Sequence, residues 1–339
     1  MHPIDAAALA AYLRGRIEDF SGELAIEQFQ GGQSNPTYRI TAGDRRYVLR
    51  RKPSGALLPS AHAVDREFRV MAALAGTDVP VAKPYALCED ASVIGTAFYV
   101  MEHVEGRILW DPLLPGMTAE ARAAHYDELN RVIAALHRVD CAAVELADYG
   151  KPGNYVERQI ARWSRQYAAS GAERIPAMDR LIEWLPQRVP KGDETALVHG
   201  DFRLDNVIFH PTEPRVLAVL DWELSTLGHP LSDFAYHAMA WRLAPHQFRG
   251  LKGCAFGALG IPTEEEYVAA YCRRTGRDAI ADWEVYLIFN LFRIAAILHG
   301  VLSRALLGNA ASGNAADTGR RALGLADLAW DMAQRLDAG

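Results

Sequence analysis

The stretch "LVHGDFRLDNVIFH", residues 197–210, gathers polar side chains between two apolar runs. A further apolar run, residues 216–220, stops abruptly at Asp221. Apolar runs this short, ending on polar residues, are typical of buried strands that lead into loops. The pattern therefore predicts that the ends of neighbouring strands aim Asp201, Asn206 and Asp221 at one site.

The spacing within this stretch indicates a kind of chemistry. The segment "HGDFRLDN" has the form H-x-D-x-x-x-x-N, which is the spacing of the catalytic loop of kinases. In such a loop one carboxylate, here Asp201, accepts the proton of a substrate hydroxyl. An amide and a second carboxylate, Asn206 and Asp221, supply hard oxygen ligands for Mg²⁺. Because Asp and Asn also form turns and caps, the residues alone leave a structural role open.

Composition places the chain among folded proteins with more than one core. Its 339 residues are many for a single core, so two domains or lobes are expected. Hydrophobic residues make up 50% of the chain, which suffices for packed cores and argues against disorder. The net charge of −6 argues against non-specific nucleic-acid binding.

Cysteines and apolar runs bear on the cellular compartment. The four cysteines are scattered without a C-x-x-C pair, so we expect reduced thiols and neither disulfides nor a zinc site. The amino-terminal segment has the pattern of an amphipathic helix and not of a signal peptide. No uninterrupted apolar run approaches the ~18 residues of a membrane span. We therefore expect a cytoplasmic protein without nucleic-acid or membrane partners, whose oligomeric state the sequence leaves unknown.

Residues 24–102 have the pattern of strands. Two successive hairpins are expected first, with turns at Gly31-Gly32 and at residues 42–44. Residues 60–76 have helical periodicity and are followed by two further strand patterns. The first third of the chain therefore predicts a small antiparallel sheet with one helix inserted between its strands.

Helical patterns replace strand patterns after Glu102. An amphipathic stripe over residues 119–140 is the first of them. The boundary separates a small β-rich lobe, residues 1–103, from a larger and mainly helical lobe, residues 104–339, so the expected fold class is α+β. Further helices are expected near residues 231–243, 263–275, 283–307 and 317–337.

The motif "VHGDFRLDNVIF", followed by "VLAVLDWELSTLGHPLSDFAYH", resembles the aminoglycoside phosphotransferase (APH)-like family of small-molecule kinases. The likeness extends over nearly the whole chain and is closest to the branch that is fused to acyl-CoA dehydrogenases in some proteins. It implies a bilobal protein-kinase-like fold, with a nucleotide-binding N-terminal lobe and a catalytic and substrate-binding C-terminal lobe. It also implies ATP and Mg²⁺ as cofactors, Asp201 as the catalytic base, and Asn206 and Asp221 as metal ligands.

The first expected hairpin turn, "GGQSN" at residues 31–35, can cover phosphates. Backbone N–H groups around Gly32 would donate to phosphate oxygens, and Ser34 would add a hydroxyl donor. Gly-Gly turns are common in hairpins, so the turn gains its meaning from the motifs downstream.

The strand "YVLRRK" supplies the expected phosphate-binding cation. Arg50 stands where the resemblance places the strand lysine of kinases, and Glu67 in the following helix is its expected partner. Arginine can bind phosphate bidentately, although its fork has a different reach from that of lysine. Alternation along the strand puts Lys52 on the same face; of the two cations we favour Arg50.

Two more features follow from the resemblance. "FYVMEHVEG" is similar to the hinge between kinase lobes, where adenine would hydrogen bond to the backbone near Glu102 and Val104. In "HPLSDFAYH", Asp233 would brace the catalytic loop through backbone N–H groups, and His199 would orient that loop from within.

Other classes of protein compete with this interpretation. A metal-dependent hydrolase could use His199, Asp201, Asp221 and His229 as ligands, but would leave the upstream hairpin and the Arg/Glu pair unexplained. A nucleotide-binding pseudokinase scaffold would suit the arginine at position 50, but not the intact catalytic set. Protein-kinase activity is disfavoured, because the eleven residues between Asp221 and Asp233 are too few for a substrate-docking activation loop.

The function expected is therefore transfer of the γ-phosphoryl group of ATP to a hydroxyl of a small molecule. The helices that would bind the acceptor are too generic in sequence to identify it. The resemblance to the branch linked to acyl-CoA dehydrogenases suggests a hydroxyacyl compound or its CoA ester. A preference for ATP over GTP cannot be derived from these residues.

Overall fold

The computed structural model describes residues 4–29, 35–53, 63–306 and 315–338, which form two compact units. The first unit contains the expected β-rich lobe and two later segments of the chain, the second of which includes the end of the motif. It comprises residues 1–109, 141–146 and 205–225. The second unit comprises residues 110–140, 147–204 and 226–339.

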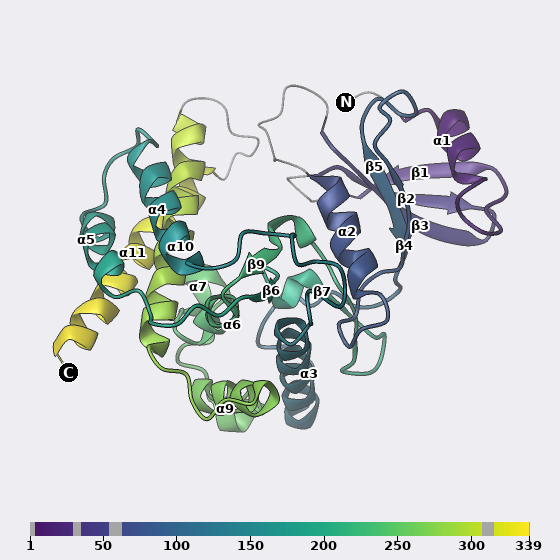
Figure 1. Ribbon diagram of the computed structural model, residues 1–339. Coiled ribbons are helices and arrows are strands. Elements are labelled where there is room, and N and C mark those ends of the chain that lie inside the picture. Colours follow the sequence, from purple (N-terminus) through teal and green to yellow (C-terminus); the bar gives the residue numbers. More distant parts are fainter. Residues whose placement is uncertain (1–3, 30–34, 54–62, 307–314, 339) are drawn as a thin grey trace. The chain divides into compact units, whose positions relative to one another are not determined.

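Five antiparallel strands form the sheet of the first unit, in the order β1-β2-β3-β5-β4 (Figure 1). A tight turn joins β2 to β3, with Ala42 opposite Arg45, as the pattern of residues 42–44 predicted. The other expected turn, at Gly31-Gly32, lies outside the described residues. The strands are β1 (Leu24–Gln28), β2 (Thr37–Ala42), β3 (Arg45–Arg51), β4 (Pro84–Cys88) and β5 (Phe98–Glu102).

The two faces of this sheet are covered by different helices (Figure 1). Helix α1 (Ala6–Leu13) packs on one face, where alternate strand residues such as Ile40 and Leu49 are fully buried with it. Helix α2 (Val64–Leu74) contacts β4 and β5. Because neighbouring strand residues point to opposite faces, Arg50 and Tyr99 lie on the α2 face, away from the α1 core.

A separate hairpin completes the first unit. Its second strand is joined to the unit by a 2.9 Å hydrogen bond from the Val219 N–H to the Pro80 carbonyl. Asn206 and Asp221 lie just outside its two ends, so the hairpin fixes their backbones relative to each other. The elements here are β7 (Val207–Phe209), β8 (Val216–Val219) and the 3₁₀ turns η2 (Leu204–Asn206) and η3 (Trp222–Leu224).

The second unit is mainly helical and is built around α10 (Trp283–Leu306). This helix packs against α4, α5, α6 and α11, and its residues from Leu287 to Phe292 are almost entirely inaccessible. One short antiparallel strand pair, β6 with β9, leads into the catalytic motif. The remaining elements are α3 (Ala119–His137), α4 (Tyr155–Ala168), α5 (Pro176–Trp184), η1 (Leu185–Gln187), β6 (Ala196–Val198), β9 (Thr226–Gly228), α6 (Pro230–Ala238), η4 (Met239–Trp241), α7 (Pro245–Phe248), α8 (Phe256–Leu259), α9 (Glu264–Thr275) and α11 (Ala315–Ala338).

Helix α10 is apolar enough to draw comparison with a membrane span. Over Trp283–Arg304 it has a mean hydropathy of 1.9 and sufficient length to cross a bilayer. However, 78% of that window is buried inside the structure, which is typical of the core helix of a folded domain. We therefore interpret α10 as the centre of the core of the second unit.

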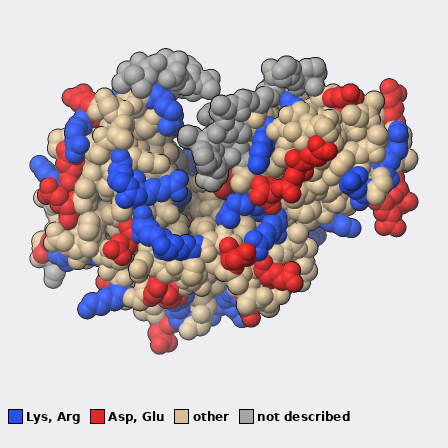
Figure 2. All heavy atoms as spheres, turned by 45° about the horizontal axis from the view of Figure 1, so that its top comes forward, with Lys and Arg blue, Asp and Glu red and all other residues tan. Residues whose placement is uncertain are grey.

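Charged side chains of both signs are spread over the surface in Figure 2. Lys and Arg side chains lie among Asp and Glu side chains on the face that the figure draws. This agrees with a chain that has 36 basic and 42 acidic residues.

Candidate active site

Asp201 lies in the loop after β6 and is held by two side chains of the second unit. Tyr236 on α6 donates a hydrogen bond to Asp201 Oδ1. Arg203 places its Nε 3.0 Å from the same oxygen, and its Nη2 lies 3.4 Å from Oδ2. The Asp201 side chain keeps 20% of its surface exposed. A partly exposed carboxylate with a fixed orientation suits a residue that accepts a proton from a bound hydroxyl.

Asp233, in the first turn of α6, braces the backbone of this loop. Its carboxylate accepts hydrogen bonds of 2.8 Å from the N–H groups of both His199 and Gly200. A third contact comes from His137 Nε2 at 3.1 Å. Burial would raise the pKa of Asp233, but hydrogen bonds and charge from His137 and His199 hold it below its usual value. The predicted contact with backbone N–H groups is thus present in the structure.

The conformation of the loop depends on a glycine and on the buried histidine. Gly200 has a φ of 82°, in the region where a side chain would be strained. His199 is fully buried, and its Nδ1 accepts a 3.2 Å hydrogen bond from the Asp201 N–H. This geometry fits the expected role of His199 as an internal orienting group.

Tyr236 and Arg203 are functional candidates that the sequence did not single out. Tyr236 follows Asp233 by one helical turn, so the two side chains lie on the same face of α6. That i, i+3 spacing in "SDFAYH" was the available signal. Arg203 stands two residues after the expected base and could have been noticed as a cation inside the motif.

The first unit contains a buried cluster of charges around Arg50. Arg50 Nε lies 2.9 Å from Glu67 Oε2, so the expected ion pair is present. Glu67 is also bonded by Asn35 Nδ2 at 2.7 Å and by the Tyr99 hydroxyl at 3.0 Å. Strand alternation explains the cluster, because residues 50 and 99 both project toward α2.

Arg50 also reaches the segment that follows β8. Its Nη2 donates a 2.7 Å hydrogen bond to Asp221 Oδ1 and lies 3.5 Å from Glu223 Oε2. Burial raises the pKa of Glu67 to about 7, against the opposing effect of Arg50 and of its hydrogen-bond donors. Burial opposes the charge of Arg50, but the negative charges of Glu67, Asp221 and Glu223 raise its pKa above the ordinary value. One guanidinium therefore joins the helix residue Glu67 to the expected metal ligand Asp221.

Asn206 and Asp221 are adjacent in the first unit. The Leu220 N–H donates a 2.8 Å hydrogen bond to the Asn206 carbonyl, which aligns the two ends of the hairpin. Asp221 adopts a left-handed conformation, with φ 64° and ψ 57°, which is uncommon for residues other than glycine. Its side chain is 35% exposed, whereas Asn206 is nearly buried at 9%.

This pair fits a magnesium site. One accessible carboxylate and one amide oxygen are hard ligands, and the ion would complete its shell with phosphate oxygens and water. Among the described residues there is no group of three His, Cys, Asp or Glu side chains that could hold a metal by themselves. Such a sparse ligand set is typical of Mg²⁺ that binds together with a nucleotide.

The remaining predicted residues are placed as follows. Gly32 and Ser34 lie outside the described residues. Lys52 is on the α2 side but lies 3.7 Å from Asp65, so of the two candidate cations Arg50 is the one that pairs with Glu67. At the expected hinge, the Glu102 N–H donates to the Lys83 carbonyl at 2.8 Å.

Val104, the second expected hinge residue, lies just beyond the end of β5. Within the described ranges, no group forms a hydrogen bond with its backbone. The N–H and carbonyl of Val104 therefore offer a donor and an acceptor of the kind that an adenine ring requires.

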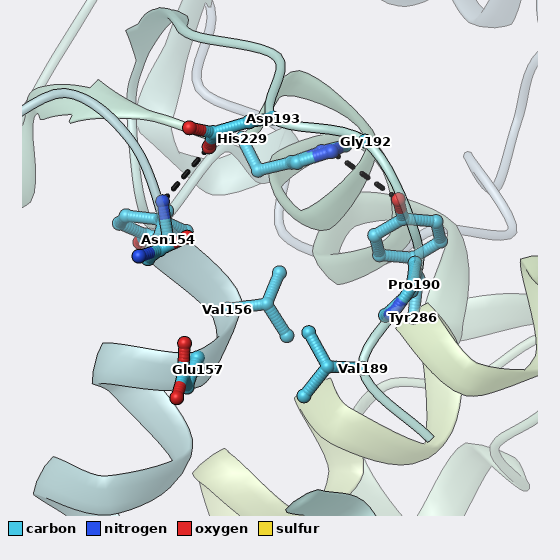
Figure 3. A pocket seen from close by; sticks show the side chains of 10 residues that line it. Asn154, Val156, Glu157, Val189, Pro190, Gly192, Asp193, His229 and Tyr286 are labelled. Carbon is cyan, nitrogen blue, oxygen red and sulfur yellow. Dashed lines mark hydrogen bonds between the residues drawn. The ribbon is translucent and has the colours of Figure 1, made fainter. Parts of the chain in front are cut away.

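A separate pocket of about 230 Å³ lies in the second unit (Figure 3). Buried Val156, His229 and Tyr286 line it, and the His229 Nε2 and Tyr286 hydroxyl are 3.3 Å apart. At its edge the Asn154 N–H donates a 2.8 Å hydrogen bond to Asp193. None of the residues expected to carry out catalysis lines this pocket.

Comparison with known proteins agrees with these features. The model of the phosphotransferase enzyme family (APH) matches residues 25–287. A solved structure from Ralstonia eutropha, provisionally designated an aminoglycoside phosphotransferase, is 57% identical, covers 98% of this chain and 99% of its own, and has a TM-score of 0.92. A thermostable mutant of the aminoglycoside phosphotransferase APH(4)-Ia, solved with AMP-PNP and hygromycin B, is 19% identical with a TM-score of 0.62, over 96% of this chain and 99% of that one. The latter likeness is one of fold.

Curated relatives are longer proteins. Acyl-CoA dehydrogenase family member 10 of Mus musculus is 51% identical over 97% of this chain and 31% of its own length. Family member 11 of Homo sapiens is 45% identical over 92% of this chain and 41% of its length. This chain therefore spans less than half of these relatives. With a family model that matches most of its length and the kinase-like architecture described above, the chain belongs to the phosphotransferase enzyme family and is a small-molecule kinase.

Proposed function

We propose that the protein transfers the γ-phosphoryl group of ATP to a hydroxyl group of a small molecule. The observation that carries this proposal is the position of Arg50 between Glu67 and Asp221. A buried cation that joins a helix carboxylate to a metal-binding carboxylate is the arrangement that organises nucleotide phosphates in kinases. A purely structural ion pair would not require the second, partly exposed carboxylate of Asp221.

The first unit would bind the nucleotide. Arg50, held by Glu67, would bind the α- and β-phosphates, and the backbone of Glu102 and Val104 would meet the adenine ring. Asn206 and Asp221 would hold Mg²⁺, which when bound neutralises charge on the phosphates. Phosphate contacts from Gly32 and Ser34 belong to the same proposal.

The second unit would supply the base. Asp201 would accept the proton of the acceptor hydroxyl. Tyr236 and Arg203 would hold its carboxylate in the orientation that this step needs. Asp233 would keep the loop in place through His199 and Gly200. In phosphoryl transfer, positioning and electrostatics supply most of the rate enhancement, so rigid support of this kind is what the chemistry needs.

For the acceptor we propose a hydroxyacyl compound, free or as a CoA thioester. The support is the identity of 51% to a protein named acyl-CoA dehydrogenase family member 10, in which a region similar to this chain accompanies further sequence. Domains that are joined in one polypeptide often act on related compounds. The substrate class that the name of this relative suggests is therefore the first to test. Cytoplasmic location belongs to the same proposal.

A metal-dependent hydrolase is the main alternative. It would need several His and carboxylate ligands around one ion, and the part of the chain that the structure describes contains no such group. A pseudokinase scaffold would bind Mg-ATP without turnover. Turnover measurements separate these classes directly.

The test is ADP formation by the purified protein with Mg-ATP and a panel of hydroxylated acceptors. The panel includes hydroxyacyl-CoA esters, free hydroxy acids, aminoglycosides, choline and sugars. We expect acceptor-dependent ADP release that is lost in Asp201→Ala, with ATP affinity kept within about threefold. Asp327→Ala, which removes an exposed carboxylate on α11, serves as the matched control. Full turnover by Asp201→Ala would overturn the proposal.

A further inference from the structure

Arg293 is a buried cation in the middle of the apolar helix α10. Its residue exposure is 6%, and it stands in the sequence "IFNLFRIAAIL". Within the described ranges no carboxylate forms an ion pair with it. Burial of a charge without a counter-ion is costly, so its remaining contacts must be strong enough to offset that cost.

Those contacts converge on the loop that carries Asp201. Arg293 Nη2 donates a 2.7 Å hydrogen bond to the carbonyl of Gly200, the residue directly before Asp201. The guanidinium carbon also lies 5.2 Å from the centre of the Tyr236 ring, within the range of a cation–π contact. Tyr236 in turn donates to Asp201 Oδ1.

The two contacts fix different parts of the expected base. The Gly200 N–H is held by Asp233 and its carbonyl by Arg293, so this left-handed residue is bonded on both sides. The Tyr236 ring, held by Arg293, orients the carboxylate. Burial, and then the charge of Asp201, raise the pKa of Tyr236 well above its usual value, so the hydroxyl keeps its proton and remains a donor.

We infer that Arg293 is a positioning residue for the phosphoryl transfer proposed above, acting on Asp201 through the Gly200 carbonyl and the Tyr236 ring. This inference rests on the proposed role of Asp201. It explains why a full positive charge is retained in the core of an otherwise apolar helix, 92 positions beyond the base. An uncharged residue would pack there at lower cost, but would leave the Gly200 carbonyl without its donor.

The experiment compares kcat and KM for Mg-ATP in Arg293→Met, Arg293→Lys and Tyr236→Phe with the wild-type protein. ADP formation is followed with the best acceptor of the panel above, or with water as acceptor if none is used. We expect kcat to fall about 10- to 100-fold in Arg293→Met and Tyr236→Phe, with KM for Mg-ATP nearly unchanged, because general-base positioning is what is lost. Arg293→Lys keeps a charged donor and should recover part of kcat.

A double-mutant cycle with Asp201→Asn, measured on the residual turnover of that variant, separates positioning from general stability. If Arg293 acts through Asp201, Arg293→Met causes little further loss of kcat once Asp201 is replaced. Independent, additive losses would overturn the inference. Arg242→Gln is the matched control: it breaks two ion pairs, with Glu264 on α9 and Glu284 on α10, and should leave kcat unchanged.

The outcomes distinguish the two proposals. Full turnover by Asp201→Asn overturns the proposed function itself. A large fall of kcat in Asp201→Asn, with wild-type kcat in Arg293→Met, overturns the inference alone. If Arg293→Met does not fold, Tyr236→Phe and Arg293→Lys still test it, since both retain nearly the full volume of the side chain.

Discussion

Arg50 Nη2 donates a 2.7 Å hydrogen bond to Asp221 Oδ1, a contact that joins residues 171 positions apart in the sequence. The same guanidinium forms an ion pair with Glu67 through its Nε. A planar fork with several donors can serve two carboxylates at once, whereas an ammonium group is a compact point charge. The arginine at this position, where kinases use lysine, therefore has a geometric reason in this chain.

Arg50→Lys is expected to weaken binding of Mg-ATP. A lysine can keep one of the two carboxylate contacts, and a lost charge-assisted hydrogen bond is worth roughly 1.5–3 kcal/mol. We expect KM for Mg-ATP to rise about tenfold or more, measured by steady-state ADP formation. Arg46→Lys, on the same strand but in an exposed pair with Glu105, should change KM by less than about twofold. Equal effects of the two variants would contradict the role given to Arg50.

Glu67 should make stability depend on pH near neutrality. Its pKa is about 7 in the folded protein, above the ordinary value of 4.5. The folded state thus binds the proton more tightly, so this contribution to stability is complete below pH 4.5 and is lost as the pH rises through 7. The shift corresponds to about 3 kcal/mol.

The measurement compares the free energy of unfolding in urea from pH 5 to 8 for wild type and Glu67→Gln. The wild-type value should decline with pH relative to that of Glu67→Gln, which does not titrate. Glu105→Gln, at an exposed position, should run parallel to the wild type. Parallel curves for wild type and Glu67→Gln would show that Glu67 is ionised throughout this range.

Several contacts of this candidate site were expected from the sequence because their signals are local. The motif spacing singled out Asp201, Asn206 and Asp221, and the resemblance to kinases suggested Arg50 and Glu67 as partners, a contact that the structure contains. The first inference uses residues within one motif, where spacing determines direction, and the second uses one strand and the helix that follows it. The predicted sheet and helical region were also confirmed, for the same reason.

Tyr236, Arg293 and Glu223 could not be assigned in the same way. The contact of Arg293 with Gly200 depends on how α10 packs against the rest of its unit, and periodicity reports only that a residue is buried. From the sequence alone, Tyr236 is indistinguishable from an aromatic residue of the hydrophobic core, because its contact with Asp201 appears only in the structure. The signal for Arg293 was a charge within an apolar run, which marks a residue as unusual but does not name its partner.

Asp221→Asn is expected to weaken metal binding while preserving the backbone. Asparagine tolerates the left-handed conformation at φ 64°, and its amide can still accept a hydrogen bond from Arg50. We expect the Mg²⁺ concentration for half-maximal turnover to rise at least about tenfold, because a carboxylate ligand is lost. Asp221→Ala should lose the same metal affinity and also about 1 kcal/mol of stability from backbone strain. An unchanged Mg²⁺ requirement in Asp221→Asn would remove this residue from the metal site.

Asp233 should matter for stability and turnover, but little for nucleotide binding. Its carboxylate satisfies the N–H groups of His199 and Gly200 and a nitrogen of His137 in a fully buried place. Removal of a buried acceptor costs roughly 1–3 kcal/mol for each group left unpaired, so Asp233→Ala should be among the most destabilising changes in the second unit.

Asp233→Asn keeps an acceptor oxygen and should fold, yet its amide N–H₂ faces a donor and disturbs the loop before Asp201. We therefore expect Asp233→Asn to lower kcat about tenfold or more, with ATP affinity unchanged by calorimetry, because the Arg50 cluster belongs to the first unit. Wild-type kcat in Asp233→Asn would mean that the brace serves folding and not catalysis.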